Sequence, residues 1–215
     1  EIPEELSKLS RLEDLLLGGN FLNGSIPNSL GDLRSLRVLD LTNNRLTGEI
    51  PPELGKLTNL ERLNRGGCNG LTGKIPVEIA GLTNLQELNL YSNSLDGEIP
   101  RELANLSQLR DLKLYRNRLT GNIPAELGKL TELEILYLSF NELKGNIPSD
   151  LGNLHELRQL DLEENLLTGE IPKSLAELNH LEYSDFRRNE LTGCIPFGMR
   201  GIIETDPVLP VCAAP

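Results

Sequence analysis

The chain has 215 residues, of which 38% are hydrophobic and 25% charged, and its 32 acidic and 21 basic residues give a net charge of −11. This charge disfavours nonspecific attraction to nucleic acid and to anionic lipid. The sequence has no run of about 18 apolar residues, so we expect no membrane insertion by this segment.

A repeat of 24 residues organises the chain, and residues 109–132 show it most clearly as LRDLKLYRNRLTGNIPAELGKLTE. The copies begin at Leu12, Leu36, Leu60, Leu85, Leu109, Leu133, Leu157 and Leu181. The sequence thus divides into a partial first repeat (1–11), eight repeats (12–193) and a C-terminal cap (194–215). Self-similarity at this period predicts a solenoid in which each unit buries its apolar edge against its neighbours.

Residues 1–11, EIPEELSKLSR, match only the second half of the repeat. Either the native protein continues upstream, or Ile2, Leu6 and Leu9 close the stack unaided. We expect a truncated or cleaved start, because a bare repeat edge exposes leucine and unpaired strand groups.

Each repeat opens with a short predicted strand. Leu112 and Leu114 alternate with Lys113, which places both leucines on the core side and the lysine outside. Asn117 follows where the chain leaves the strand, and a buried amide there can bond the backbone groups of neighbouring turns. Its equivalents are Asn20, Asn44, Asn93, Asn141, Asn165 and Asn189. A polar ladder this regular indicates a structural role rather than a chemical one.

The second half of the repeat is a return path. Gly121 tolerates a positive φ, and Pro124 fixes φ and removes a donor, so this path is extended and kinked. A short helical turn through AELGKL is then expected to carry the chain back to the next strand.

The third copy departs from the pattern. It has 25 residues, and the extra residue falls between Arg65 and Cys68. Arg65 stands where neighbouring copies have Leu90 and Leu114. Because a charged side chain cannot stay inward unpaired, we expect the strand to slip and Arg65 to face solvent. Cys68 is either a small buried thiol or an exposed thiol able to pair with another molecule.

The full pattern, LxxLxLxxNxLTGxIPxxLGxL, covers residues 2–196 and resembles the plant-specific subclass of leucine-rich repeats. The resemblance implies an α/β solenoid, curved, with a concave parallel β-sheet, short extra strands, and 3-10 or helical turns on the outer side. It also implies a binding role, because similar domains form the ectodomains of receptor kinases and the secreted inhibitors of polysaccharide-degrading enzymes.

The last residues, RGIIETDPVLPVCAAP, do not repeat. The resemblance implies that Cys194 and Cys212 form a disulfide here, worth about 3 kcal/mol by chain entropy; two unrelated buried thiols are the alternative. A disulfide favours an oxidising compartment and hence a secreted or extracellular protein. The sequons at Asn23 and Asn105 then permit glycosylation.

The sequence offers no catalytic, metal or cofactor site. The motifs GxxxxGK[ST], GxSxG, HExxH and CxxC are absent. His155 and His180 lack a second ligand at metal-binding spacing, so we interpret them as surface residues. Asp161, Glu163 and Glu164 are acidic neighbours, which we interpret as solvated charge rather than a catalytic pair or a calcium site. We therefore predict that the protein is not an enzyme.

Aromatic residues make up only 4% of the chain, yet four of the eight lie at outward strand positions of three consecutive copies. The candidate ligand-binding residues at such positions are Tyr91, Lys113, Tyr115, Arg116, Tyr137, Phe140, Asp161 and Glu163. At a strand spacing of about 4.8 Å, the aromatic residues would form one patch roughly 10 Å across. Tyrosine with arginine is typical of binding hot spots, although aromatics also pack across strands for their own sake. The acidic residues would orient a basic group of a partner. The same pattern places Ser139 and Asp185 outward.

The leading interpretation is an extracellular module that binds a protein or peptide on its concave face. One alternative is a secreted inhibitor of a polysaccharide-degrading enzyme. Another is a structural or surface-binding solenoid, for example an ice-associated one, which would need a flat row of identical side chains. The outward residues change sign from copy to copy, so the sequence does not predict such a row on the strand face.

Overall fold

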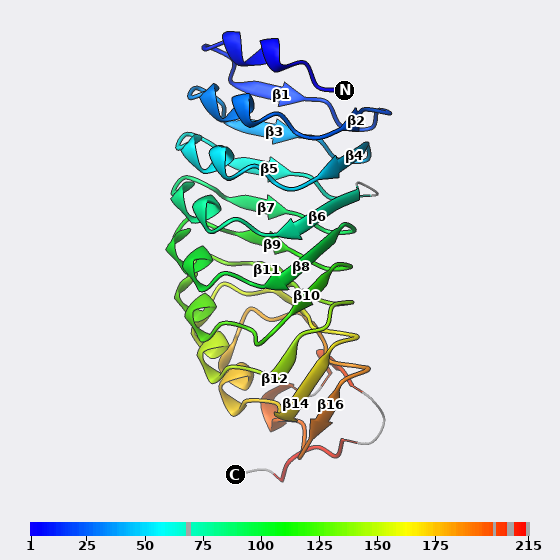
Figure 1. The fold of residues 1–215 in the computed structure, drawn as a ribbon. Helices are drawn as coiled ribbons and strands as arrows, with labels where there is room; N and C mark the ends of the chain where they lie inside the picture. Colours follow the sequence, from blue (N-terminus) through cyan, green and yellow to red (C-terminus); the bar gives the residue numbers. More distant parts are fainter. Residues whose placement is uncertain (68–69, 200, 206–208, 214–215) are drawn as a thin grey trace.

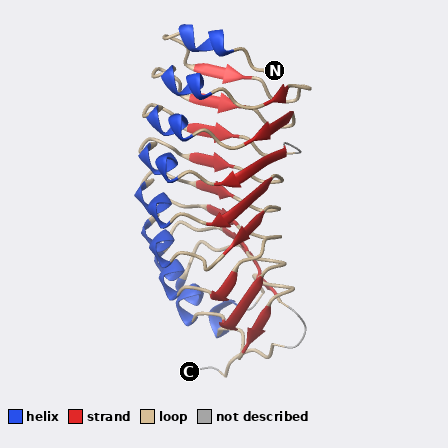
Figure 2. Ribbon diagram, viewed as in Figure 1, coloured by secondary structure: helices blue, strands red, loops and turns tan. Residues whose placement is uncertain are grey.

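The computed structural model describes residues 1–67, 70–199, 201–205 and 209–213 as a curved solenoid with its two termini at opposite ends of the stack (Figure 1). Each repeat contributes a strand to one long sheet, a second short strand beside it, and a 3-10 turn on the outer edge (Figure 2). In the described part of the chain, no helix has the length and apolar character needed to cross a membrane.

Within the described residues, the concave sheet has nine parallel strands in sequence order. They are β1 (Asp14–Leu16), β3 (Val38–Asp40), β5 (Arg62–Asn64), β7 (Glu87–Asn89), β9 (Asp111–Lys113), β11 (Ile135–Tyr137), β13 (Gln159–Asp161), β15 (Tyr183–Asp185) and β17 (Ile203–Glu204). Equivalent residues face each other across the sheet, as in the pairing of Leu112 with Leu136. The repeat therefore sets the register, and each repeat position forms a column along the solenoid.

The short extra strands form two further parallel sheets, as predicted. The first contains β2 (Asn23–Gly24), β4 (Arg45–Gly48), β6 (Gly70–Lys74), β8 (Ser94–Glu98) and β10 (Arg118–Thr120); the second contains β12 (Lys144–Asn146), β14 (Leu166–Glu170) and β16 (Glu190–Thr192). A bridge between Asn122 and Lys144 connects the two sheets.

The expected helical turns are 3-10 turns of the outer edge. They are η1 (Glu4–Lys8), η2 (Asn28–Asp32), η3 (Pro52–Lys56), η4 (Val77–Gly81), η5 (Arg101–Asn105), η6 (Ala125–Lys129), η7 (Ser149–Asn153), η8 (Lys173–Glu177) and η9 (Phe197–Met199). The residue before η6 is Pro124, whose φ of −63° and ψ of 127° keep the return path extended until the turn begins.

The core is a stack of leucines between these layers, with the predicted asparagine ladder at its edge. Leu112 and Leu114 have no exposed surface. The amide nitrogen of Asn117 donates to the carbonyl oxygens of Leu114 and Leu90, both at 3.0 Å, and its oxygen accepts from the Leu95 N–H at 3.1 Å. The equivalent asparagines from Asn44 onward satisfy backbone groups of their own repeat and of the preceding one, whereas Asn20, in the first full repeat, is exposed and bonds, among the described residues, only to Leu17 and Gly18.

The C-terminal cap is closed by the predicted disulfide. Cys194 and Cys212 are bonded, with their Cα atoms 5.0 Å apart. A bridge between Ile195 and Val211 runs beside them. The strand leucines of the eighth copy are replaced by Ser184 and Phe186, and both are buried.

The prediction for Arg65 is wrong. Strand β5 does not slip, because Leu63 pairs with Leu88 in the regular register. The N–H of Arg65 continues that register by donating to the Asn89 carbonyl oxygen at 2.8 Å, so its side chain points inward and has no exposed surface. The extra residue is therefore absorbed after the strand. Burial lowers the pKa of Arg65 to about 9. Cys68 lies outside the described residues.

Glycine in several 3-10 turns allows neighbouring turns to approach closely. A Cβ atom added to Gly128 in η6 would overlap the backbone carbonyl oxygen of Asp150 in η7. In η4 and η5 the same position holds Ala80 and Ala104, and these turns pack less closely against the next turn. The choice of glycine or alanine therefore follows the spacing of the outer edge.

We predict that Arg65→Leu raises the free energy of unfolding at pH 7 by about 1–4 kcal/mol, because a leucine replaces a buried charge. Equilibrium urea unfolding measures this change. The gain should shrink as pH rises above about 9, because the unfolded chain holds the Arg65 proton to higher pH than the folded protein does, so wild-type stability rises there. A less stable variant at pH 7 would show that Arg65 makes a net favourable contribution.

We also predict that Gly128→Ala lowers the free energy of unfolding by about 1–3 kcal/mol, because the new methyl group would overlap a neighbouring carbonyl. Thermal and urea unfolding measure the effect. Alanine has the higher helical propensity, so an unchanged or increased stability would mean that the turns can separate without cost.

Candidate functional site

The three central tyrosines lie on adjacent strands of the concave sheet. Tyr91 follows β7, Tyr115 follows β9, and Tyr137 ends β11. Beneath them Leu90 and Leu114 are fully buried. The leucines fill the core, and the register of the sheet brings the three rings together on the outer surface.

The rings of Tyr91 and Tyr115 are stacked, with centroids 4.8 Å apart and planes within 1° of parallel. The ring of Tyr137 meets that of Tyr115 edge-on, at 6.1 Å between centroids and 73° between planes. Both are favourable arrangements of aromatic pairs. We call these three residues the aromatic column, in which Tyr137 stands at the repeat position of Lys113, two residues before the position of Tyr91 and Tyr115. Burial raises the pKa of Tyr115 and of Tyr137, so their hydroxyls stay protonated.

Gly66 makes room for this column, a role that the repeat pattern alone did not predict. It occupies the position that Tyr91 and Tyr115 hold in the next two copies. A Cβ atom added to Gly66 would overlap the ring of Tyr91. Its φ is not positive, so the need for glycine here comes from the ring alone. Glycine at a position where neighbouring copies carry tyrosine was the available signal.

The two predicted basic residues of the patch differ in their surroundings. The guanidinium of Arg116 lies 5.2 Å from the centroid of the Phe140 ring, and Arg116 makes no ion pair with any residue that the structure describes. The ammonium of Lys113 lies 6.0 Å from the ring centroid of Tyr137, but it also pairs with Asp111 at 2.8 Å. Arg116 is therefore the more available cation of the two.

The acidic residues beside the column form a compact group. Carboxylate oxygens of Asp161, Glu163 and Asp185 all lie within 4.8 Å of one another. Burial raises the pKa of Asp161 and of Glu163. Burial also opposes ionisation of Asp185, but hydrogen bonds from Arg187 at 2.5 to 3.1 Å outweigh it and lower its pKa. Arg187 thus already supplies positive charge to the group.

Two residues expected on the open face are buried instead. The hydroxyl of Ser139 donates to Asp161 of the next repeat at 2.6 Å, and only 1% of Ser139 is exposed. Asp185 is also 1% exposed, because Tyr183 and Arg187 close over it with hydrogen bonds. Strand alternation correctly gave their side of the sheet, but neighbouring side chains cover them.

The remaining predicted positions lie away from the concave sheet. Asn23 is exposed in β2, and Asn105 is exposed at the end of η5. His155 and His180 are exposed as expected, and His180 lies 3.4 Å from the carboxylate of Glu156.

Two family models match the chain. The model described as a leucine-rich repeat region matches residues 2–123, and the model described as Leucine Rich Repeat matches residues 132–154 and 156–178. The search of curated proteins gave no match.

Solved structures give close matches to the fold. The ectodomain of the Arabidopsis receptor kinase HAESA, in complex with an N-terminally extended IDA peptide hormone, matches at a TM-score of 0.90 and 37% identity over 95% of this chain. The ectodomain of the receptor kinase GASSHO1/SCHENGEN3 from Arabidopsis thaliana, in complex with CASPARIAN STRIP INTEGRITY FACTOR 2, matches at 0.88 and 40% over 95%. The chain spans 34% of the first receptor chain and 25% of the second. A plant ice-binding protein matches at 0.71 and 28%, over 99% of this chain and 79% of that one.

We predict that Gly66→Ala displaces the Tyr91 ring and lowers the free energy of unfolding by about 1–3 kcal/mol. Near-UV circular dichroism and the ring-proton chemical shifts of Tyr91 and Tyr115 report the loss of stacking. Gly70→Ala in the same repeat is the matched control, because a Cβ there meets its nearest atom at 3.5 Å. Unchanged tyrosine shifts in Gly66→Ala would contradict the role assigned to this glycine.

Proposed function

Because the chain belongs to the leucine-rich repeat family, we propose that it is an extracellular module that binds a protein or peptide on its concave face. The observation that carries this proposal is the aromatic column of Tyr91, Tyr115 and Tyr137. Its rings are half-buried, ordered by their mutual contacts, and not required to fill the leucine core. Rigid tyrosines of this kind provide contact area at low entropic cost.

The charges around the column favour a partner with two kinds of group. Arg116 can bind an acidic group beside Phe140. Asp161 and Glu163, two repeats further along, favour a basic group. A ligand lying along the solenoid axis would contact the rings and the positively charged Arg116 first, and then the negatively charged Asp161 and Glu163. This charge order would fix the direction in which the ligand binds.

The extracellular location rests on the disulfide and on the receptor ectodomains that the chain resembles. Asn23 and Asn105 are the proposed glycosylation sites, because both are exposed sequon residues outside the concave sheet. Glycans at these residues would leave the aromatic column accessible.

A surface-binding solenoid is less well supported. The outward threonines of the extra strands are Thr47, Thr72, Thr120, Thr168 and Thr192. Asp96 on β8 and Lys144 on β12 interrupt this row. The concave column positions are also mixed in charge and size. In the part of the chain that the structure describes, no arrangement of side chains favours an inhibitor of a polysaccharide-degrading enzyme over a peptide-binding module.

We predict that the triple variant Tyr115→Ala, Tyr137→Ala, Arg116→Glu loses at least about 2 kcal/mol of binding free energy for its ligand, because it removes the centre of the patch. A pull-down from native extracellular fluid, with calorimetry on the captured protein or peptide, measures this loss.

The matched control is Phe21→Ala with Arg45→Glu. These two residues form another aromatic and arginine pair, with the guanidinium 4.9 Å from the ring centroid, outside the concave sheet. The control should bind as the wild type does, and both variants should keep wild-type thermal stability. Equal capture by the triple variant would place the ligand site elsewhere.

A further inference from the structure

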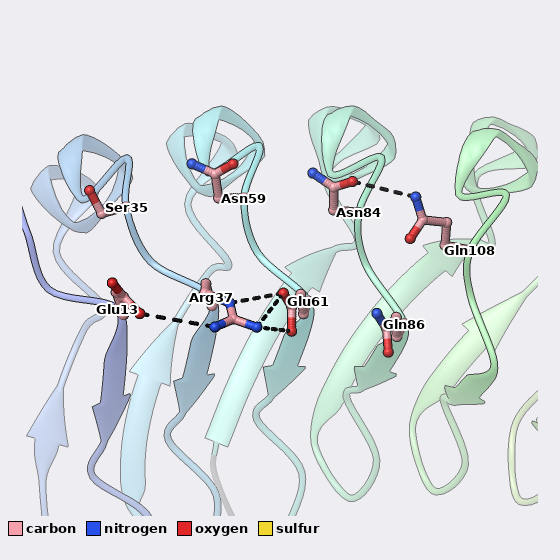
Figure 3. Close-up of a pocket in the computed structure, with 8 residues that line it drawn as sticks. All are labelled: Glu13, Ser35, Arg37, Asn59, Glu61, Asn84, Gln86 and Gln108. Carbon is pink, nitrogen blue, oxygen red and sulfur yellow. Dashed lines mark hydrogen bonds and ion pairs between the residues drawn. The ribbon is translucent and has the colours of Figure 1, made fainter.

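A second surface, separate from the aromatic column, runs along the flank between the concave strands and the 3-10 turns. A hollow of about 530 Å³ lies there. Two rows of side chains border it (Figure 3). One row contains Ser35, Asn59, Asn84 and Gln108, and the other contains Glu13, Arg37, Glu61 and Gln86. We call this hollow the flank trough. All eight of its lining side chains are polar or charged.

The repeat builds the trough from two sequence positions. Residues of the first row immediately precede the first leucine of a repeat, and residues of the second row immediately follow it. Each row therefore offers one side chain per strand, at a spacing of about 4.8 Å. A second hollow of about 360 Å³ shares Gln86 and Gln108 with the first and extends to Arg110 and Glu132. The two hollows together suit an extended chain that crosses the strands.

The first row is fixed in orientation. Ser35, Asn59 and Asn84 donate to backbone carbonyl oxygens of the preceding repeat, each at 2.8 Å. Gln108 donates to the side-chain oxygen of Asn84 at 3.4 Å. Among the residues that the structure describes, the side-chain oxygen of Asn59 and, in the second row, the side-chain carboxamide of Gln86 have no hydrogen-bond partner. The row is thus preorganised, and it retains unused donors and acceptors.

The charges of the second row are satisfied within the row. Arg37 lies 2.9 Å from Glu61 and 4.0 Å from Glu13 (Figure 3). Its guanidinium is therefore already neutralised, and the net charge of −11 further disfavours a polyanion.

We propose that the flank trough binds a neutral, hydroxyl-rich chain, namely a linear oligosaccharide lying across the strands. Carboxamides donate and accept hydrogen bonds, as sugar hydroxyls do. Aromatic and aliphatic side chains are missing from the lining, so the trough has no apolar anchor of the kind that binds a peptide side chain. For the same reason we expect binding in the millimolar range. This site is independent of the concave face.

The test is a titration of the glycosylation-free domain with the neutral hexasaccharides cellohexaose, xylohexaose and mannohexaose, followed by NMR. At least one should bind saturably, with shifts in the side-chain amides of Asn84 and Gln86. The variant Asn59→Ala, Asn84→Ala, Gln86→Ala should bind at least tenfold more weakly. If that variant is unstable, Gln86→Ala with Gln108→Ala removes two amides that hold no backbone carbonyl.

The matched control is Asn153→Ala with Asn179→Ala, which removes exposed amides outside the trough. This control, and the triple variant of the aromatic column, should bind the saccharide as the wild type does. Absence of saturable binding of any neutral hexasaccharide would overturn the proposal. So would equal binding by the trough variants, or binding of hexagalacturonate in preference to the neutral chains.

Discussion

The asparagine ladder is the interaction on which the rest of the structure depends. A solenoid has contacts only between adjacent repeats, so each junction needs its own means of fixing the register. Asn141 shows how this is done: its amide nitrogen donates to Leu114 and Leu138, and its oxygen accepts from Leu119. The same side chain thereby joins two strands of the concave sheet to an extra strand. Losing one such amide would leave buried backbone groups of two repeats without partners.

A fixed register has a functional consequence, because it converts repeat positions into columns. Residues in a column lie about 4.8 Å apart whatever their identity. The leucine and asparagine columns are constrained by burial, whereas outward columns are free to vary. Tyr91, Tyr115 and Tyr137 use that freedom on the concave sheet, and Asn59 and Asn84 use it on the flank. Both proposed sites are thus surface variations on one constant core.

The sequence was sufficient for the repeat, the three kinds of element, the asparagine ladder and, through family resemblance, the disulfide. The repeat and the asparagine ladder depend on periodicity, which a sequence displays directly, whereas the extra strands and the disulfide came from the resemblance to the leucine-rich repeat subclass. It was insufficient for Arg65, because periodicity does not say whether an extra residue is absorbed within a strand or after it. Ser139 and Asp185 were misplaced because alternation gives the side of a sheet but not what a neighbouring repeat lays over it. Gly66 was missed because its role is visible only when the Tyr91 ring is in place.

The distribution of glycine and alanine at this position of the outer turns also affects the curvature of the solenoid. Strand spacing is constant along the concave sheet, so a wider gap between outer turns forces a larger bend angle at that junction. The wider gaps carry Ala80 and Ala104, and they fall behind β7 and β9, which support Tyr91 and Tyr115. Looser packing of the outer turns at these junctions therefore adds to the bend of the array on the side opposite the stacked rings. Small residues in the outer 3-10 turns thus help to set the shape of the concave face.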